Sequence, residues 1–351
     1  MKFECYTDWE QLPESADELF AQGEKDSIFF SRPWFESLAA VALDDEHTMA
    51  LACVVAADKV VAILPLMKSP GKTWYSLKHR YTSLYSLLLT DNHQLEDQLE
   101  VQQQVLACLV QGLSQLPIQA FIFEPVADND SRLDGLQKMM ETAGFSCEHN
   151  FRHYNWIYRV QGESYEDYMA ARPAKLRNTI TRKKRKLERE HGYEISLFTG
   201  DEVAQKMSDY YASYTASWKA KEQYVDFLDD IVAGFSKQDW SRLAVLYVKE
   251  QPIAAQLWFV LHGKANIFRL AYDEAWKPYS PGSILTSYLM EYVIDIDKVD
   301  EIDFLTGNDA YKQDWMSERR ERFALSCINS VKPTGRFQLF VESLKSLLKR
   351  I

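Results

Sequence analysis

The order of strand-like and helix-like segments in the first half of this chain recurs in its second half. Residues 54–62, a strand–turn–strand pattern, align with 247–255, and the apolar strand 121–123 aligns with 302–304. The two alignments are offset by 193 and 181 residues, so the halves differ by loop length. Strand pairs that alternate with helices predict an α/β fold in which each half forms a mixed, mainly antiparallel sheet flanked by helices.

The length of 351 residues accommodates two domains, and 46% apolar residues supply a core for each. We assign 1–155 to a first unit, 156–330 to a second unit and 331–351 to a C-terminal amphipathic helix packed on the body. One face of that helix carries Phe337, Phe340, Leu344, Leu347 and Leu348. An alternative role for this helix is a membrane foot, which its few cations disfavour.

The net charge of −11 argues against general affinity for nucleic acid or anionic lipid. The charge is uneven, because residues 171–191 carry nine Lys or Arg and only two Glu, which leaves −18 for the rest of the chain. Pro173 and Gly192 bracket a helix in this segment, with Leu176, Ile180 and Leu187 as its inner stripe. So many like charges need an anionic partner: the protein's own acidic surface, a phosphorylated ligand or RNA.

The five cysteines are scattered and never occur at CxxC spacing, so we predict no metal site and a reducing compartment. Residues 1–12 are polar and acidic, unlike a signal peptide, and no apolar run reaches the ~18 residues that a membrane span needs. These features predict a cytoplasmic location.

Three segments of the second half resemble a known family. They are the basic segment 176–189, the loop 279–285 that opens a helix, and the segment 302–315, in which a strand and Gly307 precede Tyr-Lys-x-x-Trp. The third segment is the most specific. Together they are similar to the GNAT-like acetyltransferases of the CelD type, which are related to the FemAB peptidyltransferases. The resemblance covers roughly residues 25–330 and implies two GNAT-like units, the first without donor binding because its counterpart loop near 90–94 has no glycine.

The resemblance implies acyl-CoA as co-substrate, held where a loop leads into a helix N-terminus. Lys277, Ser280, Gly282 and Ser283 fill that place, with Lys277, Ser280 and Gly282 at the family's anchor positions. Ser280 departs from the family, which has glycine there. The alternative is that Ser280-Pro-Gly is an ordinary helix cap.

The resemblance also implies that Tyr311 protonates the departing CoA thiolate and that Lys312 lies near the reacting groups. A phenol suits this role because its ordinary pKa of about 10 lies near that of a thiol. Asp303, an acid within an apolar strand, is the candidate to orient Lys312 or to accept a proton. The alternatives are that Tyr311 packs, Lys312 is solvated and Asp303 faces solvent at a sheet edge.

Four further residues are candidates for substrate binding. Arg177 and Arg182 lie on the basic helix, and guanidinium groups bind phosphate well. Tyr214 and Trp218 lie in a predicted helix over 203–221, with aromatic residues at helical spacing. That stripe is first of all a packing stripe, and one or two of its members line the acceptor pocket.

The leading prediction is an N-acyltransferase that moves an acyl group, in the first place acetyl, from acyl-CoA to an amine of a small molecule or of a cell-surface sugar or peptide precursor. Aminoacyl transfer from a charged tRNA, with the basic helix on the RNA, is the first alternative. A non-catalytic partner protein that keeps the fold is the second, because fold does not imply function.

Overall fold

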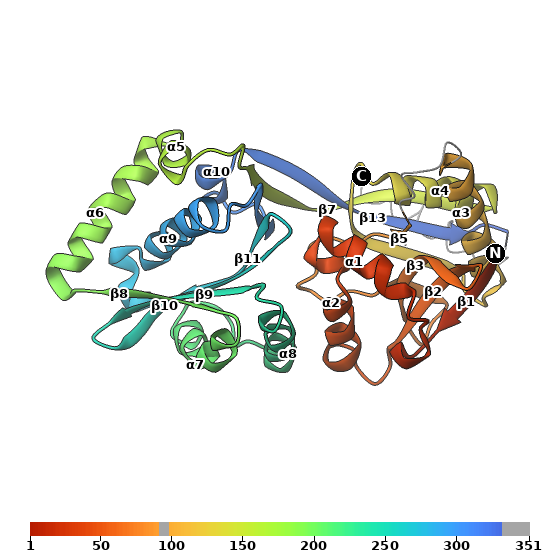
Figure 1. Ribbon diagram of the computed structural model, residues 1–351, viewed down its shortest axis with the longest axis horizontal. Helices are drawn as coiled ribbons and strands as arrows, with labels where there is room; N and C mark the ends of the chain where they lie inside the picture. Colours follow the sequence, from red (N-terminus) through yellow and green to blue (C-terminus); the bar gives the residue numbers. More distant parts are fainter. Residues whose placement is uncertain (91–97, 332–351) are drawn as a thin grey trace, which may run out of the picture. The chain divides into compact units, whose positions relative to one another are not determined.

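The computed structural model describes residues 1–90 and 98–331. It divides the chain into two compact units (Figure 1). Unit 1 takes Met1–His153 and the chain from Glu321 onward, and unit 2 takes Tyr154–Arg320. The predicted C-terminal helix and most of the loop 90–94 lie outside the described residues.

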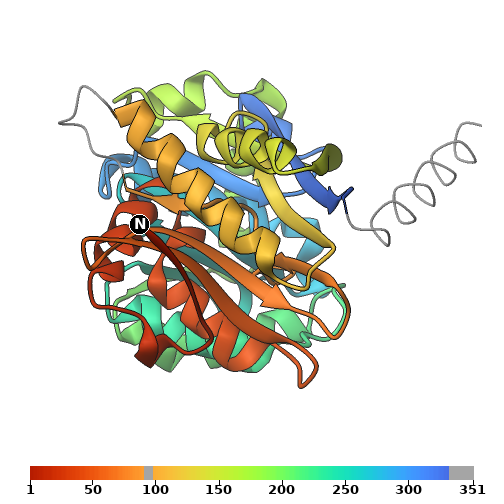
Figure 2. The same cartoon turned by 90° about the vertical axis from the view of Figure 1, so that its right-hand side faces the viewer.

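Unit 1 is an α/β unit whose strands are paired in the order β1-β2-β3-β4-β6-β13, with β5 on β3. Helices α1 and α2 cover one face of this sheet, and α3 and α4 cover the other (Figures 1 and 2). Its elements are β1 (Lys2–Tyr6), α1 (Ala16–Asp26), α2 (Arg32–Ser37), β2 (Thr48–Ala56), β3 (Lys59–Lys68), β4 (Thr73–Ser76), β5 (Leu88–Leu89), α3 (Gln98–Gln115), β6 (Ala120–Ala127), α4 (Ser131–Thr142) and β7 (Phe145–Arg159), with short helical turns at Trp9–Gln11, Ile28–Phe30 and Leu38–Ala42.

Unit 2 repeats this plan with strands in the order β8-β9-β10-β11-β12-β7. Helices α6 and α9 lie on one face of the sheet, and α7 and α8 lie on the other (Figure 1). Its elements are α5 (Tyr165–Ala170), α6 (Ala174–His191), β8 (Glu194–Thr199), α7 (Glu202–Thr215), α8 (Val225–Ser236), β9 (Ser241–Val248), β10 (Gln251–Leu261), β11 (Lys264–Tyr272), the 3-10 helix η4 (Glu274–Tyr279), α9 (Pro281–Asp295), β12 (Glu301–Thr306) and α10 (Lys312–Trp315). Strand β13 (Glu318–Asn329) follows α10 in the chain, and most of it belongs to unit 1.

The predicted repeat is present in detail. Hairpin β2–β3 turns at Ala57-Asp58 and hairpin β9–β10 turns at Lys249-Glu250, and all four residues have positive φ. This is the type I′ geometry that a two-residue hairpin loop favours. Each unit also has one parallel strand pair of three residue pairs, β4–β6 in unit 1 and β11–β12 in unit 2. The predicted α/β fold, in which each unit has a mixed, mainly antiparallel sheet flanked by helices, is confirmed.

In each unit, one strand of the sheet comes from the other half of the sequence. β13 follows unit 2 in the chain, yet its residues 322–328 pair with β6 of unit 1. β7 follows the unit 1 helices, yet its residues 155–159 pair with β12 of unit 2. The two sequence halves therefore exchange their final strands.

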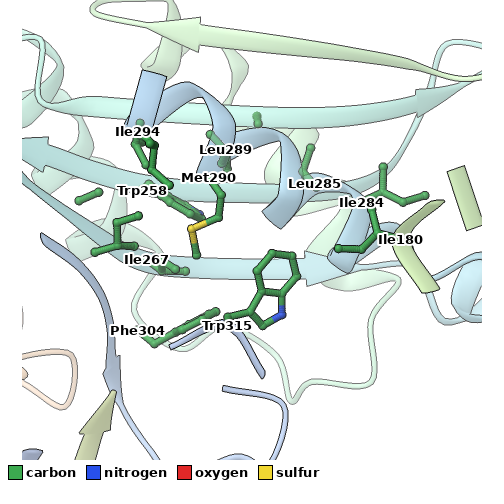
Figure 3. Close-up of a cluster of buried hydrophobic side chains, with 14 of the residues drawn as sticks. Ile180, Trp258, Ile267, Ile284, Leu285, Leu289, Met290, Ile294, Phe304 and Trp315 are labelled. Carbon is green, nitrogen blue, oxygen red and sulfur yellow. The ribbon is translucent and has the colours of Figure 1, made fainter. Parts of the chain in front are cut away.

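The apolar core of unit 2 lies between its sheet and α6 and α9. Leu176, Ile180 and Leu187 of α6 are buried in it, as the inner stripe of the basic helix predicts. Figure 3 shows the part beneath α9, where Met290 lies above Phe304 and Trp315. Strand β12 and helix α10, which carry the predicted reaction centre, are therefore fixed on this core.

Three predicted helix bounds are wrong. The helix predicted over 203–221 ends at Thr215, so Trp218 lies in the following loop, and a further helix, α8, begins at Val225. The sequence pattern over 310–319 also predicts a helix, but the structure limits it to Lys312–Trp315, because Glu318–Arg320 already belong to β13.

Candidate active site

The candidate site lies where strands β11 and β12 of unit 2 stop pairing. The two strands are parallel and paired only at Lys264↔Glu301, Ala265↔Ile302 and Asn266↔Asp303, while β11 continues to Tyr272 and β12 to Thr306. On its other side β12 has a register shift between Asp303 and Thr306, and Leu305 there has a positive φ of 54°. Left-handed backbone at a non-glycine residue is strained and is concentrated at functional sites.

Asp303 stabilises this irregular segment. One of its carboxylate oxygens accepts hydrogen bonds from the amide of Leu305, at 2.6 Å, and from the side chain of Asn155. The other oxygen accepts from Arg320 at 3.1 Å. Because both oxygens are held by donors, this geometry fits a carboxylate that fixes the backbone better than one that accepts a proton from substrate.

Lys312 is buried, with 4% of its surface exposed, at the start of α10. Its ammonium donates to the carbonyl oxygens of Phe304, at 3.1 Å, and Thr306, at 2.7 Å, and lies 3.8 Å from the carboxylate of Asp309. Burial lowers the pKa of Lys312, and the charges of Asp309 and Asp303 oppose this shift. Lys312 therefore satisfies backbone carbonyls at the end of β12.

Tyr311 precedes Lys312 and is partly exposed, with 44% of its surface accessible. Its ring meets that of Phe304 edge to face, with centroids 5.7 Å apart. Burial of the hydroxyl, and then the charge of Asp309, raise the pKa of Tyr311, so the phenol stays protonated at neutral pH. A protonated phenol at the end of β12 is suited to donate a proton.

A second lysine, Lys219, occupies the corresponding place on β11. It lies in the loop 216–224 between α7 and α8, and its ammonium donates to the carbonyl oxygen of Leu270. Burial and the nearby Arg269 lower its pKa to about 8, while Glu222 and Asp309 act in the opposite direction. The charge of Asp309 thus acts on Lys219, Lys312 and Tyr311 alike.

The helix start at Pro281 is joined to this group through aromatic side chains. Ser280 has a left-handed backbone, Pro281 opens α9, and the carbonyl of Gly282 accepts hydrogen bonds from Gln256 and Thr286, each at 2.9 Å. A Cβ at Gly282 would lie 3.2 Å from the ring of Tyr272. The ring of Tyr272 in turn packs on Trp218, with centroids 4.7 Å apart.

The remaining anchor candidates lie around this helix start. Lys277 is exposed and pairs with Glu274 at 3.3 Å. Ser283 lies in the first turn of α9, where its amide donates to the carbonyl of Ser280 at 3.1 Å. A single turn thus presents Ser280, Gly282 and Ser283.

The predicted substrate residues fall into two groups. Tyr214 and Trp218 lie beside Lys219, whose ammonium is 5.6 Å from the centre of each ring. Arg177 and Arg182 are exposed on α6. That helix is held against η4 and α9 by other cations, since Lys183 donates to Pro278, Lys184 donates to Ser287 at 3.3 Å, and Lys186 lies 4.5 Å above the ring of Tyr279.

Sequence reasoning missed Lys219, Tyr272 and Asp309. A helix over 203–221 would place Lys219 on the surface of that helix, so the sequence did not indicate that its ammonium lies near the rings of Tyr214 and Trp218. Asp309 had a signal, because it lies within the Tyr-Lys segment that the family resemblance singled out.

A pocket of about 780 Å³ in unit 2 lies elsewhere, along β8 and β9. Its lining includes Tyr193, Lys206 and Tyr247, and none of the predicted site residues. Among residues 1–90 and 98–331, no group of three or more His, Cys, Asp or Glu is arranged to hold a metal ion. Within the same residues, no helix has the length and apolar character to cross a membrane.

Comparison with known proteins identifies the domain that carries this site. The family model described as an acetyltransferase (GNAT) domain matches residues 174–313, from the start of α6 into α10. Residues 174–313 are therefore similar to a GNAT acetyltransferase domain. They contain every predicted site residue, and the predicted resemblance to GNAT-like acetyltransferases is confirmed.

Solved structures extend the likeness beyond the GNAT domain. The crystal structure of FemX matches 96% of this chain and 99% of its own, with a TM-score of 0.64 and 10% identity, so the two share a fold. A weaker match is a tandem GNAT protein from the clavulanic acid biosynthesis pathway, with a TM-score of 0.47, 11% identity, and coverage of 93% of this chain and 98% of that one. Another is the C-terminal domain of a putative lysylphosphatidylglycerol synthetase from Agrobacterium fabrum, with a TM-score of 0.48, 12% identity, and coverage of 76% of this chain and 81% of that one. No curated protein sequence matches the chain. The family-model match supports a GNAT-type acyltransferase, and the FemX match supports the fold alone.

Proposed function

We propose that unit 2 transfers an acyl group, in the first place acetyl, from acyl-CoA to an amine. The observation that carries this proposal is the end of pairing between β11 and β12 after Asn266↔Asp303. Beyond it, two strand ends, the start of α9 and the Tyr311-Lys312 pair supply the surroundings that an extended thioester needs.

The donor is proposed to bind at the start of α9. The N–H groups of a first helical turn and the helix dipole favour phosphate. Gly282 lets the ring of Tyr272 lie close to the backbone there, and Lys277 is an exposed cation in the preceding turn. Ser280, in the left-handed conformation, and Ser283 supply the hydroxyl groups of this turn.

The acyl transfer itself is proposed to take place beside α10. The amine attacks the carbonyl carbon, and the sulfur leaves with the electron pair of the C–S bond. Tyr311 donates the proton that the thiolate takes up, and its raised pKa keeps the phenol protonated until that thiolate forms. Lys312 positions the end of β12, and Asp303 fixes the irregular backbone before it.

Aromatic side chains are proposed to hold the acceptor. Trp218 is 52% exposed although it packs on Tyr272, and the ring of Tyr214 lies 5.6 Å from the ammonium of Lys219. Exposed aromatic faces suit the apolar faces of a sugar or a peptide side chain. We therefore propose as acceptor a small molecule or a cell-surface sugar or peptide precursor that carries a primary amine.

One observation favours a second function, aminoacyl transfer from a charged tRNA. Lys175, Arg182, Arg185 and Arg189 are all exposed, and their spacing places them on one side of α6. A row of cations with no intervening acid on that side suits a phosphate backbone.

Measurement of both donors side by side tests these proposals. We expect the native protein to bind acetyl-CoA in calorimetry and to release CoA thiol with at least one member of a panel of amino sugars, diamines and peptides. Tight, salt-dependent tRNA binding without acetyl-CoA binding would replace this proposal with the second one. Acetyl-CoA binding without thiol release from the panel would favour the non-catalytic reading.

A further inference from the structure

Lys219 is fixed at the open part of β11 by a loop that is anchored on both sides. On one side Trp218 packs on Tyr272 of β11, with ring centroids 4.7 Å apart. On the other side Glu222, which is buried, accepts from Arg269 of β11 at 3.4 Å and from the amide of Tyr224 at 3.2 Å. The loop therefore holds Lys219 against the strand that lines the proposed site.

The surroundings of the Lys219 amine combine apolar contact with few opposing charges. The rings of Tyr214 and Trp218 lie 5.6 Å away, and the carbonyl of Leu270 accepts one of its protons. The charged groups that face it are Arg269 from β11, Glu222 from its own loop and Asp309 from the loop after β12. Desolvation and Arg269 prevail, which lowers the pKa of Lys219 to about 8.

Asp303, Glu222 and Lys312 are engaged by other groups, and Asp309, whose side chain is 61% exposed, faces the ammonium of Lys312 at 3.8 Å. Both oxygens of Asp303 accept hydrogen bonds, and those of Glu222 bind Arg269 and the amide of Tyr224. Lys312 donates to two carbonyl groups and lies close to Asp309. Lys219, once neutral, can donate one proton to Leu270 and still present a lone pair.

We propose that Lys219 is the general base of the transfer, a role that rests on the proposed acyltransferase function. The acceptor nitrogen forms its bond to the acyl carbon, and the amine of Lys219 takes the proton that this nitrogen loses. The C–S bond breaks, and the sulfur takes the proton of Tyr311. The products are an amide and a thiol, and the proton gained by Lys219 returns to Tyr311 through solvent.

The site thus lowers the pKa of the proposed base, Lys219, and raises the pKa of the proposed acid, Tyr311. Lys219 loses its proton near neutral pH, while Tyr311 keeps its own. Two titratable groups pushed apart in this way are the pattern of an acid–base pair.

Two measurements test the proposal. In the first, trace acetic anhydride labels the native protein between pH 6 and 11, and mass spectrometry follows each lysine. Reactivity at Lys219 is expected to rise with a midpoint near pH 8, well below the value of about 10.4 of a lysine in a model peptide, and exposed Lys221 is followed in the same digest as the internal reference. A midpoint of about 10.4 at Lys219 would overturn the proposal, and this test needs no acceptor substrate.

In the second, thiol release from acetyl-CoA with the amine acceptor from the panel is followed against pH. Lys219→Met is expected to lower kcat roughly 10² fold or more and to remove the acidic limb of the profile, with acetyl-CoA affinity unchanged. Lys219→Arg restores a cation at Leu270 but cannot deprotonate, so it is expected to stay inactive. Lys221→Met is the matched control.

The outcomes separate the two proposals. If the native protein releases thiol and Lys219→Arg keeps the native rate and pH profile, the proposed acyltransferase function stands and the proposal that Lys219 is the general base is overturned. A native protein that neither binds acetyl-CoA nor releases thiol would overturn the acyltransferase function and, with it, the base.

Discussion

Lys219 and Lys312 donate to carbonyl oxygens on neighbouring strands of unit 2, Leu270 on β11 and Thr306 on β12, beyond the point where these strands pair with each other. Where strands separate, their backbone groups need other partners. Two lysines from different loops supply them here. Burial lowers the pKa of both lysines. The lowered pKa values therefore follow from the separation of the strands, because each lysine is buried where it donates to a strand carbonyl.

The first prediction concerns the backbone role of Lys312. Lys312→Met should lower the free energy of unfolding by about 1 to 3 kcal/mol, because it removes the donor to the buried carbonyl group of Phe304 and to the partly buried one of Thr306. Denaturant titration measures this, with exposed Lys237→Met as control. An unchanged midpoint would show that water replaces the ammonium.

The second prediction follows from the pKa of Lys219. Its value in the folded protein, about 8, lies below the unfolded value of about 10.4. Between these values the unfolded chain holds a proton that the folded protein lacks, so this residue makes stability rise with pH, by at most about 1.4 kcal/mol per pH unit. Unfolding between pH 8 and 10 should show a shallower rise in Lys219→Met than in Lys221→Met. Equal slopes would contradict the shift.

The third prediction concerns Gly282. A valine there would press against the ring of Tyr272, 3.2 Å from the added Cβ, and narrow the start of α9. Gly282→Val should weaken acetyl-CoA binding at least roughly tenfold in calorimetry. Gly71→Val is the control, because a Cβ at Gly71 meets nothing closer than 3.9 Å. If Gly282→Val binds acetyl-CoA with native affinity, the donor does not bind at this turn.

The fourth prediction concerns Tyr311. Tyr311→Phe keeps the edge-to-face packing on Phe304 but removes the proton donor. Turnover should fall by roughly 10² while acetyl-CoA affinity stays the same, as expected for a general acid. Equal losses of turnover and affinity would instead indicate a binding role.

The fifth prediction asks whether α6 is part of the folded body. Leu187 is fully buried, so Leu187→Ala should lower the free energy of unfolding by about 2 to 5 kcal/mol. Exposed Glu188→Ala serves as control. Native stability in Leu187→Ala would indicate that α6 is a separate arm.

Local signals predicted much of the fold. Pro173 and Gly192 bracket α6 as expected, and Gly192 caps it with a positive φ of 69°. The hairpins were visible because strand patterns flank short polar turns. Tyr311, Lys312 and Gly282 were predicted from the family resemblance. In the structure the charge of Asp309 acts on both Tyr311 and Lys312, and Gly282 lies against the ring of Tyr272.

The errors arise where contacts distant in sequence override local preference. Tyr211, Tyr214 and Trp218 have helical spacing, yet Trp218 leaves α7 to pack on Tyr272 of β11. The polar segment at 318–320 resembles a helix end, but Arg320 is paired with Glu301 and Asp303 of β12 as part of β13. The lowered pKa of Lys219 depends on such contacts too, so no local pattern predicts it.

The exchange of β7 and β13 makes the two sequence halves interdependent. A single cut in the link at 160–163, between β7 and α5, would give an N-terminal fragment whose β6 lacks its β13 neighbour and a C-terminal fragment whose β12 lacks its β7 neighbour. Each fragment would expose a sheet edge that only the other fragment can cover. The halves should therefore be poorly soluble when produced separately and regain the fold by complementation when produced together.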